Sequence, residues 1–192
     1  MDINDLKDLP YKRTRMSPTK EEIFQMIDYM QSSENRFDNF LEFGCGVSTF
    51  FLSQLKFKNY IAIEDYSPAI EQVTKYCPNV NICTKWEQIP TLKYNFVFVD
   101  SHAGGDALGH ERHKPFQYAI EHNLLLEDTI MFAHDHTMVN KGDFSRLNIN
   151  EGWHGCLNKY KWTLVKQIKF RKNFGIYKIT EHNNKTYLNE EN

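Results

Sequence analysis

Side chains suited to proton transfer are concentrated between residues 100 and 136 of this 192-residue chain. The segments Asp100-Ser101-His102 and Asp135-His136 each bring a carboxylate close to an imidazole. Histidine titrates near neutral pH, so it can accept a proton from a reacting hydroxyl group. The candidate catalytic groups are therefore Asp100, His102, Asp135 and His136.

A glycine turn, Gly44-Cys45-Gly46, follows the apolar run 37–43 and precedes a helical segment. Glycine lacks Cβ, so the backbone can turn sharply and approach a ligand closely. In a dinucleotide site the pattern would be GxGxxG, but Thr49 stands at the third glycine position, which counts against a dinucleotide. Glu64 ends the next apolar run, about 20 residues after Gly44, where a carboxylate can bind ribose hydroxyls. The turn and this acid together indicate a ribose-bearing cofactor.

Apolar runs alternate with amphipathic segments along the chain. Ser17 and Pro18 are typical of a helix start, with Ser17 as the cap. Strands are expected at 37–43, 60–64, 80–83, 95–100, 129–133, 162–170 and 174–179, and further helices at 50–55, 67–76 and 115–123. This order predicts a doubly wound, Rossmann-like α/β fold, a mostly parallel sheet with an antiparallel C-terminal hairpin strand. The carboxyl ends of such strands face one crevice, where ligands bind.

The length suits a single domain over residues 1–192, with residues 1–16 as a candidate lid and 183–192 as a frayed tail. The net charge of −2 offers no attraction for nucleic acid or an anionic membrane. No apolar stretch is long enough to span a bilayer, and the start lacks the apolar core of a signal peptide. We therefore expect a cytoplasmic protein. Its four cysteines match no zinc spacing and are expected to be free thiols.

Three motifs resemble those of class I S-adenosylmethionine-dependent methyltransferases. Leu41-Glu42-Phe43-Gly44-Cys45-Gly46-Val47-Ser48-Thr49 resembles the first motif, in which an acid lies just before a GxG turn. Ile63-Glu64-Asp65 resembles the second motif, and Phe96-Val97-Phe98-Val99-Asp100 resembles the strand whose final acid lies near the methyl donor. The resemblance covers roughly residues 20–140 and implies S-adenosylmethionine (SAM) as the cofactor and methyl transfer as the reaction.

The resemblance also implies a role for individual residues. Glu42 would lie near the methionine amino group of SAM, and Glu64 with Asp65 would bind the ribose. Trp86 would flank the adenine, with Glu87 as another candidate in that loop. The remaining implied cofactor contacts are Gly44 and Gly46 along the cofactor, Ser48 and Thr49 near its carboxylate, and Asp100 near the methyl donor.

A further resemblance concerns a metal. Catechol-type O-methyltransferases have a metal-binding Asp after the fourth strand and an Asp-Asn pair after the fifth, which Asp100 and Asp135-His136 resemble, with His in place of Asn. The resemblance implies that Asp100, Asp135 and His136 bind a divalent metal that polarises an acceptor hydroxyl. The alternative is that Asp135 orients a histidine base and no metal binds.

The acceptor is indicated by a looser resemblance to glucuronoxylan 4-O-methyltransferases, through the segments 99–105, 109–112 and 134–136. It implies a carbohydrate or other small-molecule hydroxyl acceptor, with His110 and Arg112 as substrate-binding residues. An arginine there would bind an acidic group on the acceptor. Two alternatives stay open, namely a nucleotide-dependent oxidoreductase and a non-catalytic module that binds SAM without turnover.

Overall fold

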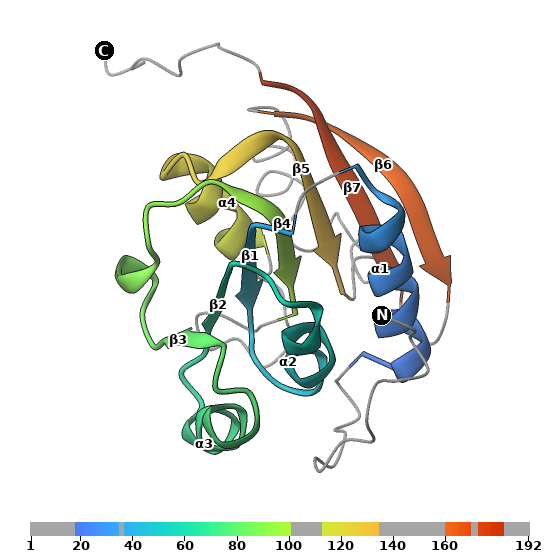
Figure 1. The fold of residues 1–192 in the computed structure, drawn as a ribbon. Coiled ribbons are helices and arrows are strands. Elements are labelled where there is room, and N and C mark those ends of the chain that lie inside the picture. The colour runs from blue at the N-terminus through green and yellow to red at the C-terminus, as the bar shows by residue number, and fades with distance from the viewer. Residues whose placement is uncertain (1–17, 35–36, 101–112, 135–159, 170–172, 183–192) are drawn as a thin grey trace, which may run out of the picture.

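The computed structural model of the chain describes residues 18–34, 37–100, 113–134, 160–169 and 173–182. Its centre is a seven-stranded sheet in the order β3-β2-β1-β4-β5-β7-β6 (Figure 1). The strands are β1 (Asn39–Phe43), β2 (Asn59–Ile63), β3 (Asn81–Cys83), β4 (Tyr94–Val99), β5 (Leu125–Ala133), β6 (Tyr160–Lys169) and β7 (Asn173–His182). Neighbours from β3 to β5 pair in parallel, whereas β7 pairs antiparallel with both β5 and β6. The predicted doubly wound sheet with its antiparallel C-terminal strand is confirmed.

Helices cover both faces of this sheet. The first three, α1 (Lys20–Ser32), α2 (Val47–Leu52) and α3 (Ser67–Tyr76), contribute apolar side chains to one buried cluster, and α4 (His113–Glu121) contributes to a second. Two short 3-10 helices, η2 (Ser53–Leu55) and η3 (Trp86–Gln88), complete the helical elements of the described residues. The sheet is thus buried on both sides, as a parallel sheet requires.

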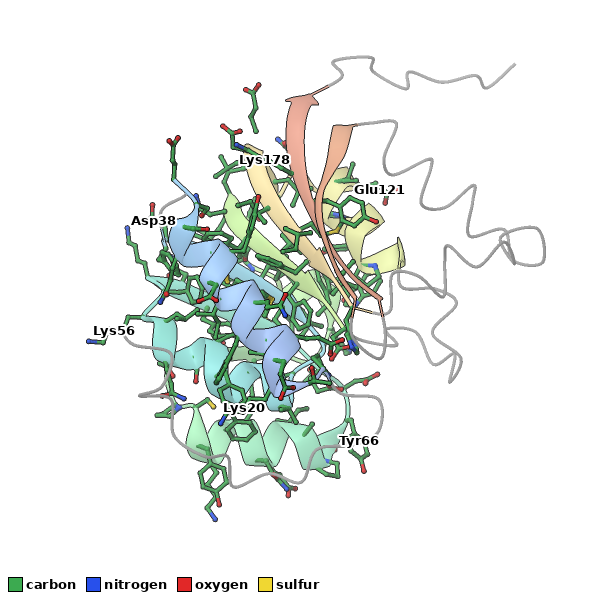
Figure 2. The ribbon with its side chains drawn as sticks, turned by 90° about the vertical axis from the view of Figure 1, so that its right-hand side faces the viewer. Lys20, Asp38, Lys56, Tyr66, Glu121 and Lys178 are labelled. Carbon is green, nitrogen blue, oxygen red and sulfur yellow. The ribbon has the colours of Figure 1, made fainter. Side chains whose placement is uncertain are left out.

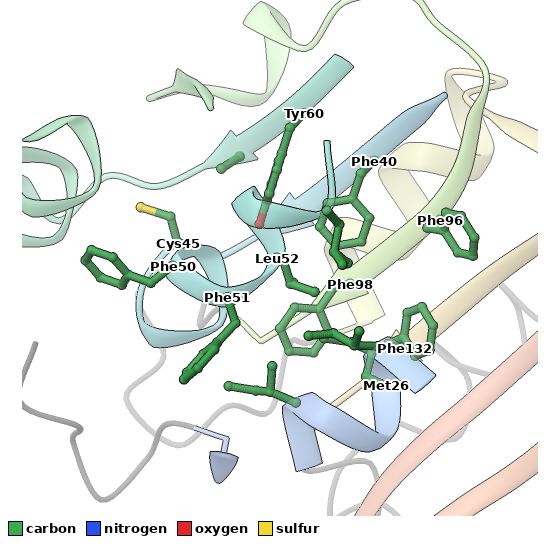
Figure 3. Close-up of a cluster of buried hydrophobic side chains, with 14 of the residues drawn as sticks. Met26, Phe40, Cys45, Phe50, Phe51, Leu52, Tyr60, Phe96, Phe98 and Phe132 are labelled. Atoms are coloured by element: carbon green, nitrogen blue, oxygen red, sulfur yellow. The ribbon is translucent and has the colours of Figure 1, made fainter. Parts of the chain in front are cut away.

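Successive residues of the central strands divide between the two clusters. In β4, Phe96 and Phe98 belong to the cluster under α1 and α2, whereas Val97 and Val99 belong to the cluster under α4. This period of two follows from the pleat of a strand. Figure 3 shows the first cluster, in which Phe98 and Phe132 lie beside Met26 of α1. The apolar packing therefore fixes the position of each central strand, and with it the position of the residue that directly follows the strand.

The start of α1 differs from the prediction. The helix begins at Lys20 with Thr19 as its cap, so the prediction that Pro18 is the first helical residue is wrong, and Ser17 lies outside the described residues. The backbone N–H of Glu22 donates to Oγ1 of Thr19 at 3.1 Å, and that of Thr19 donates to Oε2 of Glu22 at 2.7 Å. This capping box satisfies two helix-terminal donors, which explains why the helix begins after Thr19.

The remaining boundaries agree with the sequence to within a few residues. Helix α3 spans the predicted 67–76, and the predicted C-terminal hairpin is present as β6 and β7. Cys45, Cys77 and Cys83 are free thiols, while Cys156 and the terminal segments 1–16 and 183–192 lie outside the described residues. Within the described part of the chain, no helix has the length and apolar character needed to cross a membrane.

Candidate cofactor and active site

The residues that directly follow four of the parallel strands lie side by side at one edge of the sheet. Their backbone N–H groups continue the hydrogen bonding of the sheet, because each donates to the backbone oxygen of the last residue of a neighbouring strand. The pairs are Gly44 N to Ile63 O at 2.8 Å, Asp100 N to Phe43 O at 2.9 Å, Glu64 N to Cys83 O at 3.0 Å and His134 N to Val99 O at 3.1 Å. The structure therefore brings the glycine turn, Glu64 and Asp100 together at the carboxyl edge of the sheet.

The glycine turn connects β1 to α2. Gly44 is buried and has φ 96°, a conformation that residues with a side chain rarely adopt. Gly46 has an extended φ of 172°, and a Cβ added there would meet no atom of the described residues within 4 Å apart from its chain neighbours. The backbone N–H of Gly46 donates to Oγ1 of Thr49 at 2.8 Å. The two glycines therefore do different things, since Gly44 makes the bend possible and Gly46 borders an open space.

This difference predicts unequal effects of two alanine substitutions on folding stability. Gly44→Ala is expected to lower the free energy of unfolding by about 1–2 kcal/mol, because a side chain is strained at positive φ. Gly46→Ala is expected to change it by less than about 0.5 kcal/mol, as for other substitutions that meet no neighbour. Urea unfolding of both variants measures the difference, and equal stabilities would contradict the assignment of the bend to Gly44.

Glu42 lies beneath this turn and is completely buried. Its carboxylate accepts hydrogen bonds from the hydroxyls of Ser48 at 2.5 Å, Thr49 at 2.8 Å and Tyr60 at 2.5 Å. Burial raises the pKa of Glu42 from 4.5 to about 7, although the three hydroxyls lower it, and the nearby charge of Asp100 raises it further. The described contacts of Glu42, Ser48 and Thr49 thus join β1, β2 and α2 under the turn, and Thr49 links this network to the backbone of Gly46.

The raised pKa of Glu42 predicts how stability depends on pH. The folded state holds this proton up to about pH 7, whereas the unfolded chain loses it near 4.5. The stabilisation is therefore complete below pH 4.5 and is lost as the pH rises through 7, by an amount on the order of 3 kcal/mol. Glu42→Gln removes the titration and keeps a hydrogen-bond acceptor. Urea unfolding between pH 5 and 8 should show a steeper loss in the wild type, and identical pH profiles would refute the assignment.

Glu64 follows β2 and lies next to the glycine turn. Its Oε1 accepts hydrogen bonds from the backbone N–H groups of Asp65 and Tyr66, both at 3.0 Å. Burial raises the pKa of Glu64, while the N–H groups of Tyr66, Asp65 and Cys45 lower it. Because the backbone N–H of Cys45 is among the groups that lower the pKa of Glu64, this carboxylate lies near the middle of the glycine turn. Asp65 itself is exposed to solvent.

Trp86 lies in η3, after β3, and is half-buried. Its ring packs edge-on against Phe43, with centroids 6.1 Å apart, and against Tyr118 of α4, at 5.3 Å. The hydroxyl of Tyr118 donates to the backbone oxygen of Trp86 at 3.0 Å, and its ring stacks on His122 at 3.8 Å. These contacts fix Trp86 beside the end of β1, whereas Glu87 is exposed.

At the end of β4, Asp100 contacts a buried histidine that was not among the predicted site residues. Nδ1 of His134 lies 2.6 Å from Oδ1 of Asp100, and Nε2 lies 3.8 Å from Oε2 of Glu22. The sequence held a signal for His134, because it directly follows the strand predicted at 129–133. It held none for Glu22, whose position depends on how α1 packs across the sheet.

Several predicted residues lie outside the described part of the chain, namely His102, His110, Arg112, Asp135 and His136. Their roles in catalysis, substrate binding and metal binding therefore stay predictions. Among the described residues, no group of three or more His, Cys, Asp or Glu side chains is arranged to hold a metal ion. Asp100 is the one predicted metal ligand within the described ranges.

Comparisons with known proteins identify the fold. No protein-family model and no curated protein matches the sequence.

Solved methyltransferases match the structure with probability 1.00. The N-methyltransferase NodS from Bradyrhizobium japonicum is 15% identical, with a TM-score of 0.59 over 84% of this chain and 96% of that one. The SAH-bound methyltransferase PaMTH1 from Podospora anserina is 12% identical, with a TM-score of 0.62 over 85% and 80%. The putative methyltransferase yhhF from Escherichia coli is 12% identical, with a TM-score of 0.59 over 85% and 88%. The chain has the fold of class I methyltransferases.

Proposed function

We propose that this protein is a SAM-dependent methyltransferase whose cofactor binds at the carboxyl edge of the sheet, across the glycine turn and Glu64. The observation that carries the proposal is the contact between two separate sequence motifs. The backbone N–H of Gly44 donates to Ile63 O at 2.8 Å, so the glycine turn lies directly beside the residue that precedes Glu64, the proposed ribose acid. The methyltransferase PaMTH1, which shares the fold, was solved with S-adenosylhomocysteine (SAH) bound.

The residues present fit a nucleoside ligand with an amino acid tail. The open space at Gly46 leaves room for a ligand to approach the backbone. Glu64 would bind the ribose hydroxyls, with Asp65 beside it, and Trp86 would flank the adenine. Ser48 and Thr49 would act near the carboxylate of the ligand, although their hydroxyls also donate to Glu42. Glu42 itself would support the turn beneath the amino group.

The chemistry expected of the chain is alignment and proton removal. SAM supplies a methyl group that is already activated by its sulfonium. The protein holds the acceptor oxygen in line with that group and takes up the proton that the oxygen loses. Asp100, His102, Asp135 and His136 are the groups proposed for this proton, of which Asp100 stands at the described edge. We propose a sugar or another small hydroxyl compound as the acceptor, in the cytoplasm.

A dinucleotide-dependent oxidoreductase is the less favoured function. In dinucleotide sites the third glycine of GxGxxG permits close helix packing. At that position Thr49 contributes a hydroxyl that accepts from Gly46 N and donates to Glu42. The third position therefore has a structural task that glycine would not perform.

The experiment that tests the proposed function supplies SAM with a labelled methyl group and a panel of acceptors that includes monosaccharides, uronic acids and catechol. We expect acceptor-dependent formation of SAH and transfer of label to a hydroxyl compound. Repeating the active reaction after exhaustive chelation tests the metal, because retained turnover would exclude an essential divalent ion. Binding of SAH without turnover on any acceptor would instead favour a non-catalytic module.

A further inference from the structure

Three ionisable side chains, Glu22, His134 and Asp100, form a row from the first turn of α1 to the end of β4. Nδ1 of His134 lies 2.6 Å from Oδ1 of Asp100 and Nε2 lies 3.8 Å from Oε2 of Glu22. A carboxylate can only accept hydrogen bonds, so Nδ1 carries the hydrogen and donates it to Asp100. The side chains of His134 and Glu22 are 0% and 1% exposed, whereas that of Asp100 is 14% exposed. The row therefore reaches the molecular surface at Asp100.

Capping of α1 does not by itself account for Glu22. A capping box works equally well with glutamine, which carries no charge. Glu22 is a carboxylate, and its Oε1 accepts no hydrogen bond from the described residues although it is buried. Burying a polar atom in this way costs free energy. Oε2 of Glu22 lies 3.8 Å from Nε2 of His134, so this costly acidic side chain packs against the far side of the imidazole.

The location of Asp100 indicates what this arrangement of side chains serves. Its backbone N–H donates to Phe43 O, which places Asp100 directly beside the residue that opens the glycine turn. Figure 2 shows Lys20, at the start of α1, and Tyr66, at the start of α3, at one end of the molecule, so the first turn of α1 lies at the same end as the proposed site. A carboxylate held at this edge attracts a positive charge on a ligand there.

We propose that His134 is a positioning residue: through the hydrogen bond from Nδ1 it fixes the Asp100 carboxylate so that it faces the sulfonium charge of the methyl donor. This inference rests on the proposed function and deepens it with His134, which was not among the predicted site residues. Without the hydrogen bond from Nδ1, the carboxylate would lose a contact that orients it, and its attraction for the cation would weaken.

Two substitutions of His134 separate positioning from packing. The amide nitrogen of Asn superposes on Nδ1, so His134→Asn can still donate to Asp100, whereas the longer Gln places its amide near Nε2 and loses that donor. Both replacement side chains are smaller than histidine, so both variants leave some unfilled volume at this buried position. The probes are SAH, which is neutral at sulfur, and sinefungin, an analogue whose amine keeps the positive charge. Calorimetry gives the affinity of each probe, and thermal unfolding monitors the fold.

We expect His134→Gln to weaken sinefungin binding about tenfold relative to SAH, the effect typical of one lost hydrogen bond to a charged group, and His134→Asn to restore it to within about threefold. Equal changes for both probes, or no change, would overturn the positioning role. If both variants unfold, Asp100→Asn serves instead, because its amide oxygen can still accept from Nδ1 while the negative charge is removed; it should weaken sinefungin about tenfold relative to SAH, and unchanged sinefungin affinity would refute the proposal. A wild-type protein that binds neither probe would refute the proposed function itself.

Discussion

Replacing Glu64 with glutamine is expected to weaken SAH binding by roughly 10- to 100-fold while leaving the fold intact. The carboxylate accepts hydrogen bonds from Asp65 N and Tyr66 N and lies close to Cys45 N–H, so it is already oriented before a ribose arrives. Exchanging a charged acceptor for a neutral amide costs about 1–3 kcal/mol when the ligand hydroxyls lose their partner. Isothermal titration calorimetry of both proteins measures the change.

The matched control for this variant is Glu71→Gln. Glu71 is an exposed acid on α3, and its substitution removes the same charge without touching the sheet edge. It should bind SAH as the wild type does. If Glu64→Gln and Glu71→Gln bind SAH equally tightly, Glu64 does not hold the ribose, and the placement of the cofactor across β2 is wrong.

Replacing Gly46 with leucine is expected to lower SAH affinity about 100-fold. A Cβ added at this position meets no atom of the described residues within 4 Å apart from its chain neighbours, so a side chain can begin there without a clash. The cofactor is proposed to use that same room, and forcing extra methylene groups into an occupied space costs about 1–3 kcal/mol. Calorimetry with SAH together with thermal unfolding separates loss of the ligand from loss of the fold.

The control for leucine itself is Thr74→Leu on the exposed surface of α3. This variant should match the wild type in both measurements. A Gly46→Leu protein that is folded and binds SAH with unchanged affinity would show that the open space beside the turn is not part of the ligand site.

Local patterns predicted the elements well because each depends on nearby residues. The strand 95–100 is apolar throughout, as a strand buried on both faces must be, and Ser67-Pro68 is a strong helix start. The start of α1 was less predictable, because Ser17-Pro18 and Thr19 with Glu22 both resemble helix starts. The helix begins after Thr19 because the capping box of Thr19 and Glu22 satisfies two backbone donors at once.

Contacts within the site depend on residues distant in the chain, which local patterns do not pair. Tyr60 reaches Glu42 from the neighbouring strand, and its hydrogen bond partly offsets the burial that raises the pKa of Glu42 to about 7. In the same way, Glu22 meets His134 because α1 crosses the sheet near the end of β5. The strand-end positions of Glu64 and Asp100 were predictable from the sheet topology, whereas the partners of Glu42 and His134 required the packed structure.

The central claim is that the carboxyl edge of this sheet binds an S-adenosyl nucleoside, and one calorimetric comparison tests it most directly. Titrating the unmodified 192-residue chain with SAH should show one saturable site per chain, for which SAM competes, while NADH and NADPH should produce no binding heat. A protein that fails to bind SAH, or that binds a nicotinamide dinucleotide in its place, would contradict the account.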